Sequence, residues 1–267
     1  MSAVHDAMEI GVIHPTAIVC DDARIGEGVT IGPYVIVGEH CTIGPGCVLA
    51  PRAVLERNVT LAPRVKVGIG SILGGDPQDL KYGGEETFVE IGEGTVIREY
   101  STINRGTAES GKTTVGTGCL IMSYVHLAHD CHVGNGVILS NGTQFAGHVV
   151  VEDKAIVSGL CTVHQFTRIG RHSYVGGSSR VPQDIPPFMM AVGNPLRLRG
   201  LNSVGLRRSN FSDETIMELK RAYRLLFRSD LNLSQALERA ETDLQHVPEV
   251  DELLAFMQAA SQRGFTM

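Results

Sequence analysis

Three histidines lie within seven residues of one another in the segment VHLAHDCHVGNG (residues 125–136). They are His126, His129 and His132, and Asp130 follows the middle one. Clustered imidazoles suit a metal site, a catalytic base among bystanders, or a solvated polar surface, because neutral imidazole binds metals and titrates near neutral pH. The direction in which each side chain points decides among these three, and that direction depends on the fold.

The composition excludes several classes of function. The chain has 267 residues, of which 43% are hydrophobic, but it has no Trp and it contains 31 Gly. Its net charge of −6 argues against nucleic acid as the main partner, because phosphate binding needs a basic surface. No apolar run approaches the ~20 residues of a membrane span. The opening MSAVHDAMEI lacks the basic and apolar regions of a signal peptide, so we expect a cytoplasmic location without membrane insertion.

Apolar residues, aliphatic except for Phe145, recur at every sixth position along most of the chain. The series runs from Ile13 to Leu73, returns at residues 91–103, and continues from Val115 to Val181. The residue after the aliphatic one is often Gly, and the residue four positions after it is small. Five of the six cysteines occupy this small position (41, 47, 119, 131 and 161), which predicts buried apolar side chains instead of ligands or disulfide partners.

A period of six residues fits neither an α-helix nor a hairpin meander. It predicts short strands, each followed by a turn in which Gly or Asn relaxes the backbone, stacked into a solenoid. Residues 79–90 and 104–114 interrupt the period. Such insertions emerge as loops on one face, where they either bind a ligand or are simply tolerated.

The six-residue period resembles that of the hexapeptide-repeat proteins, whose fold is a left-handed parallel β-helix of triangular section. The resemblance implies three hexads in each coil, so that residues 18 apart stack. We expect a mostly β fold, with this β-helix over residues 1–190 and a small helical domain over residues 191–267.

The helical domain has its own sequence signals. The repeat should stop near Pro186-Pro187, and Gly193-Asn194-Pro195 reads as a linker. Ser212 is a suitable N-cap for a helix whose apolar stripe is Ile216, Leu219, Tyr223 and Leu226. Further helices are predicted around 234–245 and 249–262. Between Arg197 and Arg228 there are eight basic and three acidic residues, which indicates either a solvated face or a site for phosphates or an acidic partner.

In the coil register His129 lies at a corner, between inward-facing Leu127 and Cys131. A step of 18 brings Gly147 and then Gln165 to the same corner, each ~4.8 Å further along the axis. His148 and His164 adjoin these positions, so one edge gathers a set of polar side chains. The γ-class carbonic anhydrases, which are hexapeptide proteins, bind zinc through three histidines across a trimer interface. Their paired ligands are five positions apart, whereas His126, His129 and His132 step by three, so we expect no metal.

Several motifs identify a narrower family. They are QDLKYGGE (78–85), HLAHDC (126–131), FAGHV (145–149), VHQF (163–166), QDIPPF (183–188) and Gly193-Asn194. Together they resemble the acyl-carrier-protein–UDP-N-acetylglucosamine O-acyltransferases, which start lipid A synthesis. The resemblance implies transfer of an (R)-3-hydroxyacyl chain from acyl carrier protein to the 3-hydroxyl of UDP-N-acetylglucosamine.

The resemblance also implies roles for individual residues. His129 would be the general base, Asp130 would orient its imidazole, and the Gly147 N–H would face the thioester oxyanion. The remaining implied residues bind substrate: Gln78, Asp79 and Lys81 in the first insertion, His126, His148, His164 and Gln165 in the cleft, and Asn202 and Arg208 at the UDP. Val204 and Ser209 depart from the family pattern at the uridine end. Gly177 would leave the acyl groove open for a longer chain.

The same resemblance implies a homotrimer that needs no cofactor, because the acyl group arrives on the phosphopantetheine of acyl carrier protein. Two alternatives stay open. One is another hexapeptide sugar acyltransferase, such as the later N-acyltransferase of the pathway. The other is a non-catalytic solenoid that binds a partner through its loops.

Overall fold

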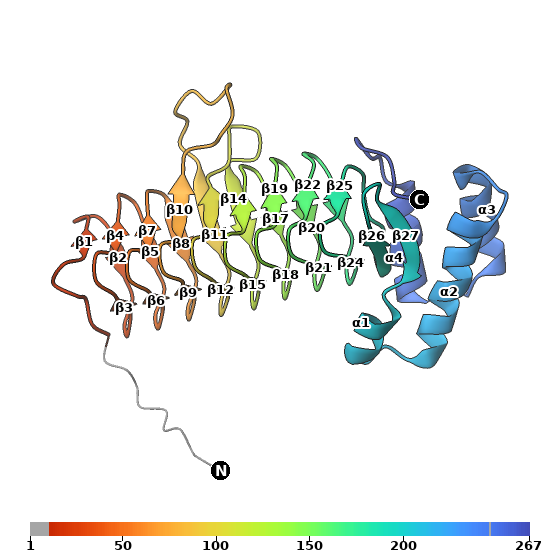
Figure 1. The fold of residues 1–267 in the computed structure, drawn as a ribbon, viewed down its shortest axis with the longest axis horizontal. Coiled ribbons are helices and arrows are strands. Elements are labelled where there is room, and N and C mark those ends of the chain that lie inside the picture. The colour runs from red at the N-terminus through yellow and green to blue at the C-terminus, as the bar shows by residue number, and fades with distance from the viewer. Residues whose placement is uncertain (1–10, 246) are drawn as a thin grey trace, which may run out of the picture. The chain divides into compact units, whose positions relative to one another are not determined.

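The computed structural model describes residues 11–245 and 247–267, which fall into two compact units, Met1–Cys131 and His132–Met267. Figure 1 shows the course of the chain. In the described residues no helix is both long enough and apolar enough to cross a membrane.

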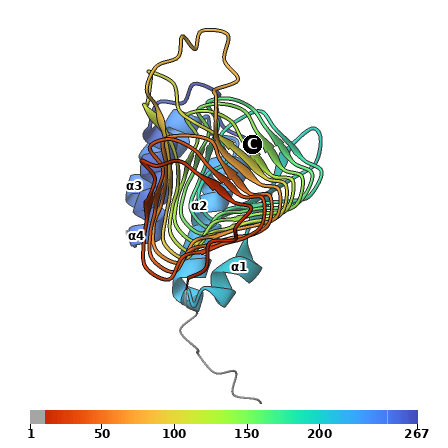
Figure 2. The ribbon, with the colours of Figure 1, turned by 90° about the vertical axis from the view of Figure 1, so that its left-hand side faces the viewer.

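Unit 1 consists of short parallel strands in three sheets, and each coil contributes one strand to each sheet. The first sheet contains β1 (Ile18–Val19), β4 (Ile36–Val37), β7 (Val54–Leu55), β10 (Ile72–Gly75), β13 (Thr102–Asn104) and β16 (His126–Leu127). The second contains β2 (Arg24–Ile25), β5 (Thr42–Ile43), β8 (Val59–Leu61), β11 (Phe88–Ile91) and β14 (Lys112–Val115). The third contains β3 (Thr30–Ile31), β6 (Val48–Leu49), β9 (Lys66–Val67), β12 (Val96–Ile97) and β15 (Leu120–Ile121). Seen end-on, these coils have a triangular outline, which confirms the predicted β-helix (Figure 2).

The strand register of unit 1 shows how many residues each of the two insertions adds to its coil. Ile18 pairs with Ile36, at the expected distance of 18 positions. Leu61 pairs with Ile91, 30 positions later, and Ile91 pairs with Val115, 24 positions later. The coils therefore accommodate 12 and then 6 additional residues. The insertions lie between β10 and β11 (residues 76–87), slightly earlier than the sequence pattern suggested, and between β13 and β14 (residues 105–111), within the range that the pattern suggested. Both project from turns that join the first sheet to the second (Figure 1).

The interior of each coil is filled by the six-residue aliphatic series. Leu55, Leu73 and Leu127 are fully buried, and the cysteines predicted to be buried are buried, with Cys20 only half-buried. All six cysteines are free thiols. Burial raises the pKa of Cys41, as it does for two other core cysteines, so these thiols act as small apolar groups.

The glycines that follow the aliphatic residues have a different purpose from the one expected. A Cβ on Gly26 would lie 2.6 Å from the Pro45 nitrogen, and one on Gly44 would lie 2.7 Å from the Pro63 nitrogen. These positions require glycine because the backbone of the next coil passes so close. The left-handed residue of each turn lies elsewhere in the hexad, and other residue types often occupy it, as at Tyr34 with φ 59°. The expectation that glycine relaxes the turn is confirmed at Gly28 and Gly46, whose φ values are 69° and 67°, but it does not explain the glycines that follow the aliphatic residues.

Unit 2 begins with further parallel coils. Its strands are β17 (His132–Val133), β18 (Ile138–Leu139), β19 (Gln144–Phe145), β20 (Val150–Val151), β21 (Ile156–Val157), β22 (Thr162–Val163), β23 (Arg168–Ile169), β24 (Tyr174–Val175) and β25 (Arg180–Val181). Strand β26 (Met189–Val192) still pairs in parallel with β24, so parallel pairing continues past Pro186-Pro187. Strand β27 (Arg197–Leu201) then runs antiparallel to β26. Gly193-Asn194-Pro195 is therefore the turn of a hairpin, not the linker that the sequence suggested.

Four helices complete unit 2: α1 (Ser203–Arg208), α2 (Asp213–Arg228), α3 (Leu233–Asp243) and α4 (Pro248–Gln258). The Ser212 hydroxyl accepts a hydrogen bond from the Thr215 N–H, which confirms the predicted N-cap of α2. Helix α1 was not predicted, because six residues are too few to show helical periodicity. Helix α4 is attached to the coils by Arg171, whose guanidinium donates to Glu252 at 2.6 and 2.9 Å.

Candidate active site

The candidate catalytic pair lies in the turn that leaves β16. Leu127 and Cys131 point into the core on either side of the turn, which fixes the directions of His129 and Asp130. His129 Nδ1 lies 2.8 Å from Asp130 Oδ2, and the two side chains are 12% and 1% exposed. A carboxylate only accepts hydrogen bonds, so Nδ1 carries the imidazole proton. Nε2 is then the nitrogen able to take a proton from a substrate hydroxyl.

The second inserted loop holds the Asp130 carboxylate. The Thr107 N–H donates to Oδ1 at 2.9 Å, the Thr107 hydroxyl donates to Oδ2 at 2.8 Å, and the Ser110 hydroxyl donates to Oδ1. Burial would by itself raise the pKa of Asp130. The hydrogen bonds from Ser110, His129 and Thr107 outweigh burial and lower that pKa to about 2. The carboxylate beside the imidazole is therefore anionic at any pH near neutrality.

A buried arginine links the second loop to the first. Arg105 is 1% exposed, and its guanidinium donates to the Gly74 carbonyl, to the Asp76 carboxylate and, at 3.1 Å, to the Tyr82 hydroxyl. The Asn104 amide adds a bond to the Asp76 carbonyl at 2.7 Å. The base of the first loop is thereby fixed to the segment that precedes Thr107.

The first loop carries the residues predicted to bind the sugar. Gln78 and Lys81 are exposed, and Asp79 is half-buried. The Asp79 carboxylate accepts a hydrogen bond from the Lys81 N–H at 3.0 Å, which shapes the turn between them. Leu80, at the same turn, is fully exposed.

His126 faces outward from β16, and its Nδ1 lies 2.7 Å from the Thr102 hydroxyl. Burial lowers the pKa of His126, and repulsion from a charged His129 lowers it further. The neutral form of His126 is thus favoured beside the catalytic pair. His132 is the first residue of β17, the strand that follows β16 in the chain.

In unit 2, the predicted residues lie in successive turns after β19 and β22. Gly147 is buried, and its N–H finds no acceptor among residues 11–245 and 247–267, while its carbonyl accepts from the Phe166 N–H at 3.2 Å. The His148 ring stacks on the Phe166 ring with centroids 4.5 Å apart. His164 Nδ1 lies 3.1 Å from the Gln165 carbonyl, and the Gln165 side chain is exposed. Unit 2 therefore groups Gly147, His148, His164 and Gln165 as the repeat predicted.

The residues predicted to hold the UDP lie at the two ends of α1. Asn202 is its N-cap: the side-chain carbonyl accepts from the Gly205 N–H at 3.1 Å, and the amide donates to the His172 carbonyl at 3.0 Å. Asn202 thus has a structural role that the sequence did not suggest. Arg208 is exposed in the last turn of α1, Val204 is 61% exposed, and Ser209 is the C-cap.

Gly177 follows β24, in a turn between different sheets from the turns of Gly147 and Gln165. It is exposed, and a Cβ added there would lie 3.3 Å from the Gly159 carbonyl oxygen. The predicted placement of Gly177 on another edge of the coil agrees with this position.

The basic residues between β27 and the end of α2 are mostly exposed. Among the described residues, four exposed arginines make no side-chain hydrogen bond or ion pair, namely Arg197, Arg199, Arg208 and Arg224, and neither does the half-buried Lys220. The acidic Glu218 is buried, and its carboxylate accepts from Arg221 and from the Gln245 N–H. The positive charges of this segment consequently dominate its surface.

Sequence reasoning missed Arg105, Thr107 and Ser110. The segment NRGTAES that carries them interrupts the hexad repeat, and this interruption was the only signal that pointed to it. A buried arginine is rare enough that no local pattern predicts one.

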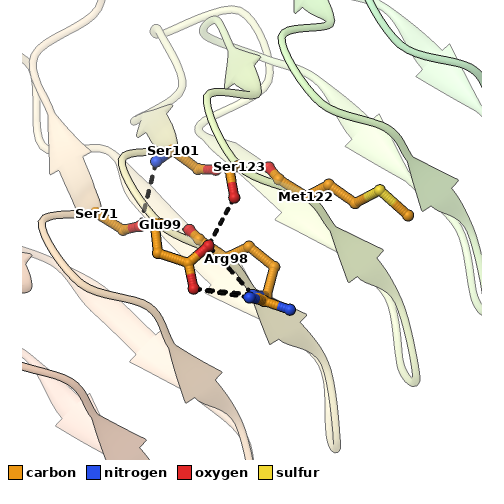
Figure 3. Close-up of polar contacts among 6 residues, drawn as sticks. All are labelled: Ser71, Arg98, Glu99, Ser101, Met122 and Ser123. Carbon is orange, nitrogen blue, oxygen red and sulfur yellow. Dashed lines mark hydrogen bonds and ion pairs between the residues drawn. The ribbon is translucent and has the colours of Figure 1, made fainter.

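A second acidic side chain of unit 1 offers a comparison with Asp130. In the turn between β12 and β13, Glu99 accepts from the Ser123 hydroxyl at 2.6 Å and from Arg98 (Figure 3). These bonds, the one from Ser123 first, lower the pKa of Glu99 to about 2. The hydrogen bonds described around Glu99 include no imidazole, so Glu99 shares the low pKa of Asp130 without being part of a candidate catalytic pair.

Comparisons with known proteins identify the family of this chain. The profile of the family described as Udp N-acetylglucosamine O-acyltransferase, Domain 2, matches residues 184–266, and that of bacterial transferase hexapeptide (six repeats) matches residues 112–147. The acyl-(acyl-carrier-protein)–UDP-N-acetylglucosamine O-acyltransferase of Verminephrobacter eiseniae is 52% identical over 92% of this chain and 95% of its own. The enzyme of the same name from Myxococcus xanthus is 49% identical over 95% of this chain and 98% of its own.

Solved structures give the same result. LpxA from Acinetobacter baumannii superimposes with a TM-score of 0.92 at 38% identity, covering 96% of this chain and 99% of that one. The chain is thus an acyltransferase and belongs to the family of the acyl-(acyl-carrier-protein)–UDP-N-acetylglucosamine O-acyltransferases.

Proposed function

We propose that this chain transfers an (R)-3-hydroxyacyl group from acyl carrier protein to the 3-hydroxyl of UDP-N-acetylglucosamine, the first step of lipid A synthesis. Family membership supports the reaction class and the substrates. The observation that carries the mechanism is the 2.8 Å contact between His129 Nδ1 and a buried, anionic Asp130.

His129 acts as the general base in this proposal. Its Nε2 removes the proton of the sugar 3-hydroxyl while the hydroxyl oxygen attacks the thioester carbonyl carbon. The carbon–sulfur bond then breaks, and the phosphopantetheine thiolate takes the proton back from the imidazolium. The Asp130 carboxylate stabilises the imidazolium that forms between these events and keeps the proton on Nδ1.

Gly147 supplies the oxyanion donor. By the 18-residue repeat of the sequence, Gly147 comes one coil after His129. Its N–H has no acceptor within the described part of the chain, and the lack of a side chain lets a thioester oxygen approach. The reaction then proceeds directly between the two substrates, without an acyl-enzyme intermediate.

The remaining predicted residues bind substrate. Gln78, Asp79 and Lys81 contact the sugar from the first loop, and His126, His148, His164 and Gln165 surround it. Arg208 holds the diphosphate, because a guanidinium forms paired hydrogen bonds with phosphate. Asn202 assists through the helix that it caps. Gly177 leaves the end of the acyl groove open.

We further propose a homotrimer in the cytoplasm. A corner of a β-helix is convex and forms a poor pocket by itself, so a second copy would complete the cleft. Acyl carrier protein docks on the exposed basic residues of the segment from Arg197 to Arg228. No metal or dissociable cofactor takes part, since the acyl group arrives already activated as a thioester.

Mass spectrometry of products tests the proposal. Acyl carrier protein thioesters of several 3-hydroxyacyl lengths are incubated with UDP-N-acetylglucosamine or its 3-amino analogue, with and without chelator. We expect an O-acylated product whose yield chelation does not change. Product from the 3-amino analogue alone would indicate an N-acyltransferase, no product from any donor would indicate a binding solenoid, and loss of activity restored by zinc would contradict the metal-free mechanism.

A further inference from the structure

The donors around Asp130 come from a loop that the hexad repeat does not need. Residues 105–111 form the second insertion, and Thr107 lies 23 positions before Asp130 in the sequence. Coils elsewhere in unit 1 turn the same corner without any insertion, for example between β4 and β5. The loop therefore has a purpose other than closing the coil.

Each oxygen of Asp130 receives two donors. Oδ1 accepts from the Thr107 N–H and the Ser110 hydroxyl, and Oδ2 accepts from the Thr107 hydroxyl and His129 Nδ1. A carboxylate has about four lone-pair positions, so these donors fill its usual capacity. Rotation of the carboxylate would break several of the bonds at once, and its plane is therefore fixed.

The imidazole depends on that plane. His129 lies in a turn, and its Nδ1–H donates to Oδ2 of Asp130. The position of Oδ2 therefore determines the orientation of the imidazole ring. We propose that Thr107 and Ser110 are positioning residues of the acyl transfer: they fix the plane of the Asp130 carboxylate and, through it, the orientation of the His129 ring. This inference rests on the proposed role of His129 as the general base.

A competing view is that these hydroxyls only stabilise the loop. The Ser110 hydroxyl also lies 3.0 Å from the Lys112 carbonyl, and the Thr107 hydroxyl accepts from the Glu109 N–H at 3.3 Å. Each hydroxyl has one proton to donate. Thr107 can donate it to Asp130 while it accepts from Glu109, and a Ser110 proton donated to Asp130 is unavailable to the Lys112 carbonyl. A double-mutant cycle with Asp130 separates the two views, because it measures only the effect that passes through the carboxylate.

The experiment measures kcat and both KM values for Thr107→Val, Ser110→Ala and the double variant, each with Asp130 and with Asp130→Asn. Asparagine suits position 130, where φ is 59°, because it tolerates the left-handed region. In the Asp130 background we expect the double variant to lose roughly 10- to 100-fold in kcat, by analogy with the cost of removing the hydrogen-bond partners that orient a metal-binding imidazole. Both KM values of the double variant should stay within about twofold of the wild-type values. In the Asp130→Asn background, kcat of the double variant should stay within about twofold of kcat of Asp130→Asn alone.

Two controls complete the design. Thr107→Ser and Ser110→Thr keep the hydroxyls and should restore most of the activity. Ser123→Ala removes a hydroxyl from another carboxylate of low pKa, Glu99, and should leave kcat unchanged (Figure 3).

The kinetic results separate the positioning role of Thr107 and Ser110 from the catalytic role of His129. If the double variant turns over like the wild type while Asp130→Asn is slow, the inference is overturned and the proposed function stands. If the loss in kcat is equally large in both backgrounds, the hydroxyls act through folding and the inference is likewise overturned. If Asp130→Asn and His129→Ala themselves keep wild-type turnover, His129 is not the general base and the proposed mechanism is wrong.

Discussion

The imidazole of His129 and the carboxylate of Asp130 meet at 2.8 Å although the two residues are adjacent in the chain. Adjacent side chains usually diverge, but Asp130 has a left-handed backbone with φ 59°, which turns its side chain back towards the histidine. The pair is mostly buried, with 12% and 1% of the side chains exposed, so the charge interaction is little screened by solvent.

Replacing His129 with alanine should lower turnover by ~10²–10⁴, as expected for loss of a general base. Steady-state kinetics measure the change, and circular dichroism should show an unaltered fold. His40→Asn is the matched control, because His40 also contacts an aspartate, Asp22, at 2.6 Å but is 58% exposed. An alanine variant that retains wild-type turnover would remove His129 from the mechanism.

The stability of the protein should fall in mild acid because of His172. Burial, and after it the positive charge of nearby Arg171, lowers the pKa of this histidine from its ordinary 6.5 to about 4. Between these two values the unfolded chain binds a proton that the folded chain does not, so stability falls as the pH drops from 6.5 towards 4. Thermal unfolding midpoints at pH 7 and pH 4.5 should therefore differ less in His172→Asn than in the wild type. Equal differences in the two proteins would contradict the prediction.

Replacing Arg105 with methionine should release the first loop from the coils. The variant loses the bonds to Gly74, Asp76 and Tyr82 while it keeps an apolar side chain of similar length. Trypsin should then cut after the exposed Lys81 faster than in the wild type, because flexible loops are the preferred sites of proteolysis. The KM for UDP-N-acetylglucosamine should rise more than the KM for the acyl donor.

Arg64→Met serves as the control for Arg105. Arg64 contacts Glu93, but its side chain is 69% exposed. Exposed ion pairs contribute little to stability, so this variant should be cut by trypsin no faster than the wild type. Similar cleavage rates for the wild type and the Arg105 variant would show that the buried guanidinium does not hold the loop.

Gly177→Met should shift the donor preference towards shorter acyl chains by an order of magnitude or more. The methionine side chain would occupy the groove that terminal methylenes otherwise fill, at a gain of ~0.8 kcal/mol for each one buried. Gly177→Ala is the graded control. Its Cβ lies 3.3 Å from the Gly159 carbonyl oxygen, a tight contact but one that adds no length. Competition between donors of different length measures the profile, and an unchanged profile in the methionine variant would refute the groove assignment.

Binding of acyl carrier protein should weaken as the salt concentration rises. Arg197, Arg199, Arg208 and Arg224 are exposed and form no ion pair with another described residue, so their field extends into solvent. Screening shortens the reach of that field to ~10 Å at 0.1 M salt. Titration of the carrier at low and high ionic strength should show the loss, and Arg199→Glu should lower the association rate. An affinity independent of salt would place the carrier elsewhere.

The sequence predicted the core of this protein well because the hexad period is a local property. Each coil repeats the same steric requirement, so an aliphatic residue at every sixth position identifies the inward-facing side chains, as at Leu55 and Leu127. The same register predicted that Gly147, His148, His164 and Gln165 would share an edge of unit 2. It failed at the hairpin of β26 and β27, where the period ends and Gly193-Asn194-Pro195 reverses the chain.

The sequence by itself thus determined the repeat, the buried cysteines and the corner that carries His129. Only the tertiary structure revealed how Asp130 is held, because Thr107 reaches it across 23 positions through a loop whose length breaks the repeat. Arg105 became recognisable as a buried connector for the same reason, since its partners Gly74 and Asp76 lie about 30 positions earlier and no periodicity relates them. Periodic burial can be read from a chain because each turn faces the same physical constraint, whereas hydrogen bonds between insertions depend on how distant segments happen to meet.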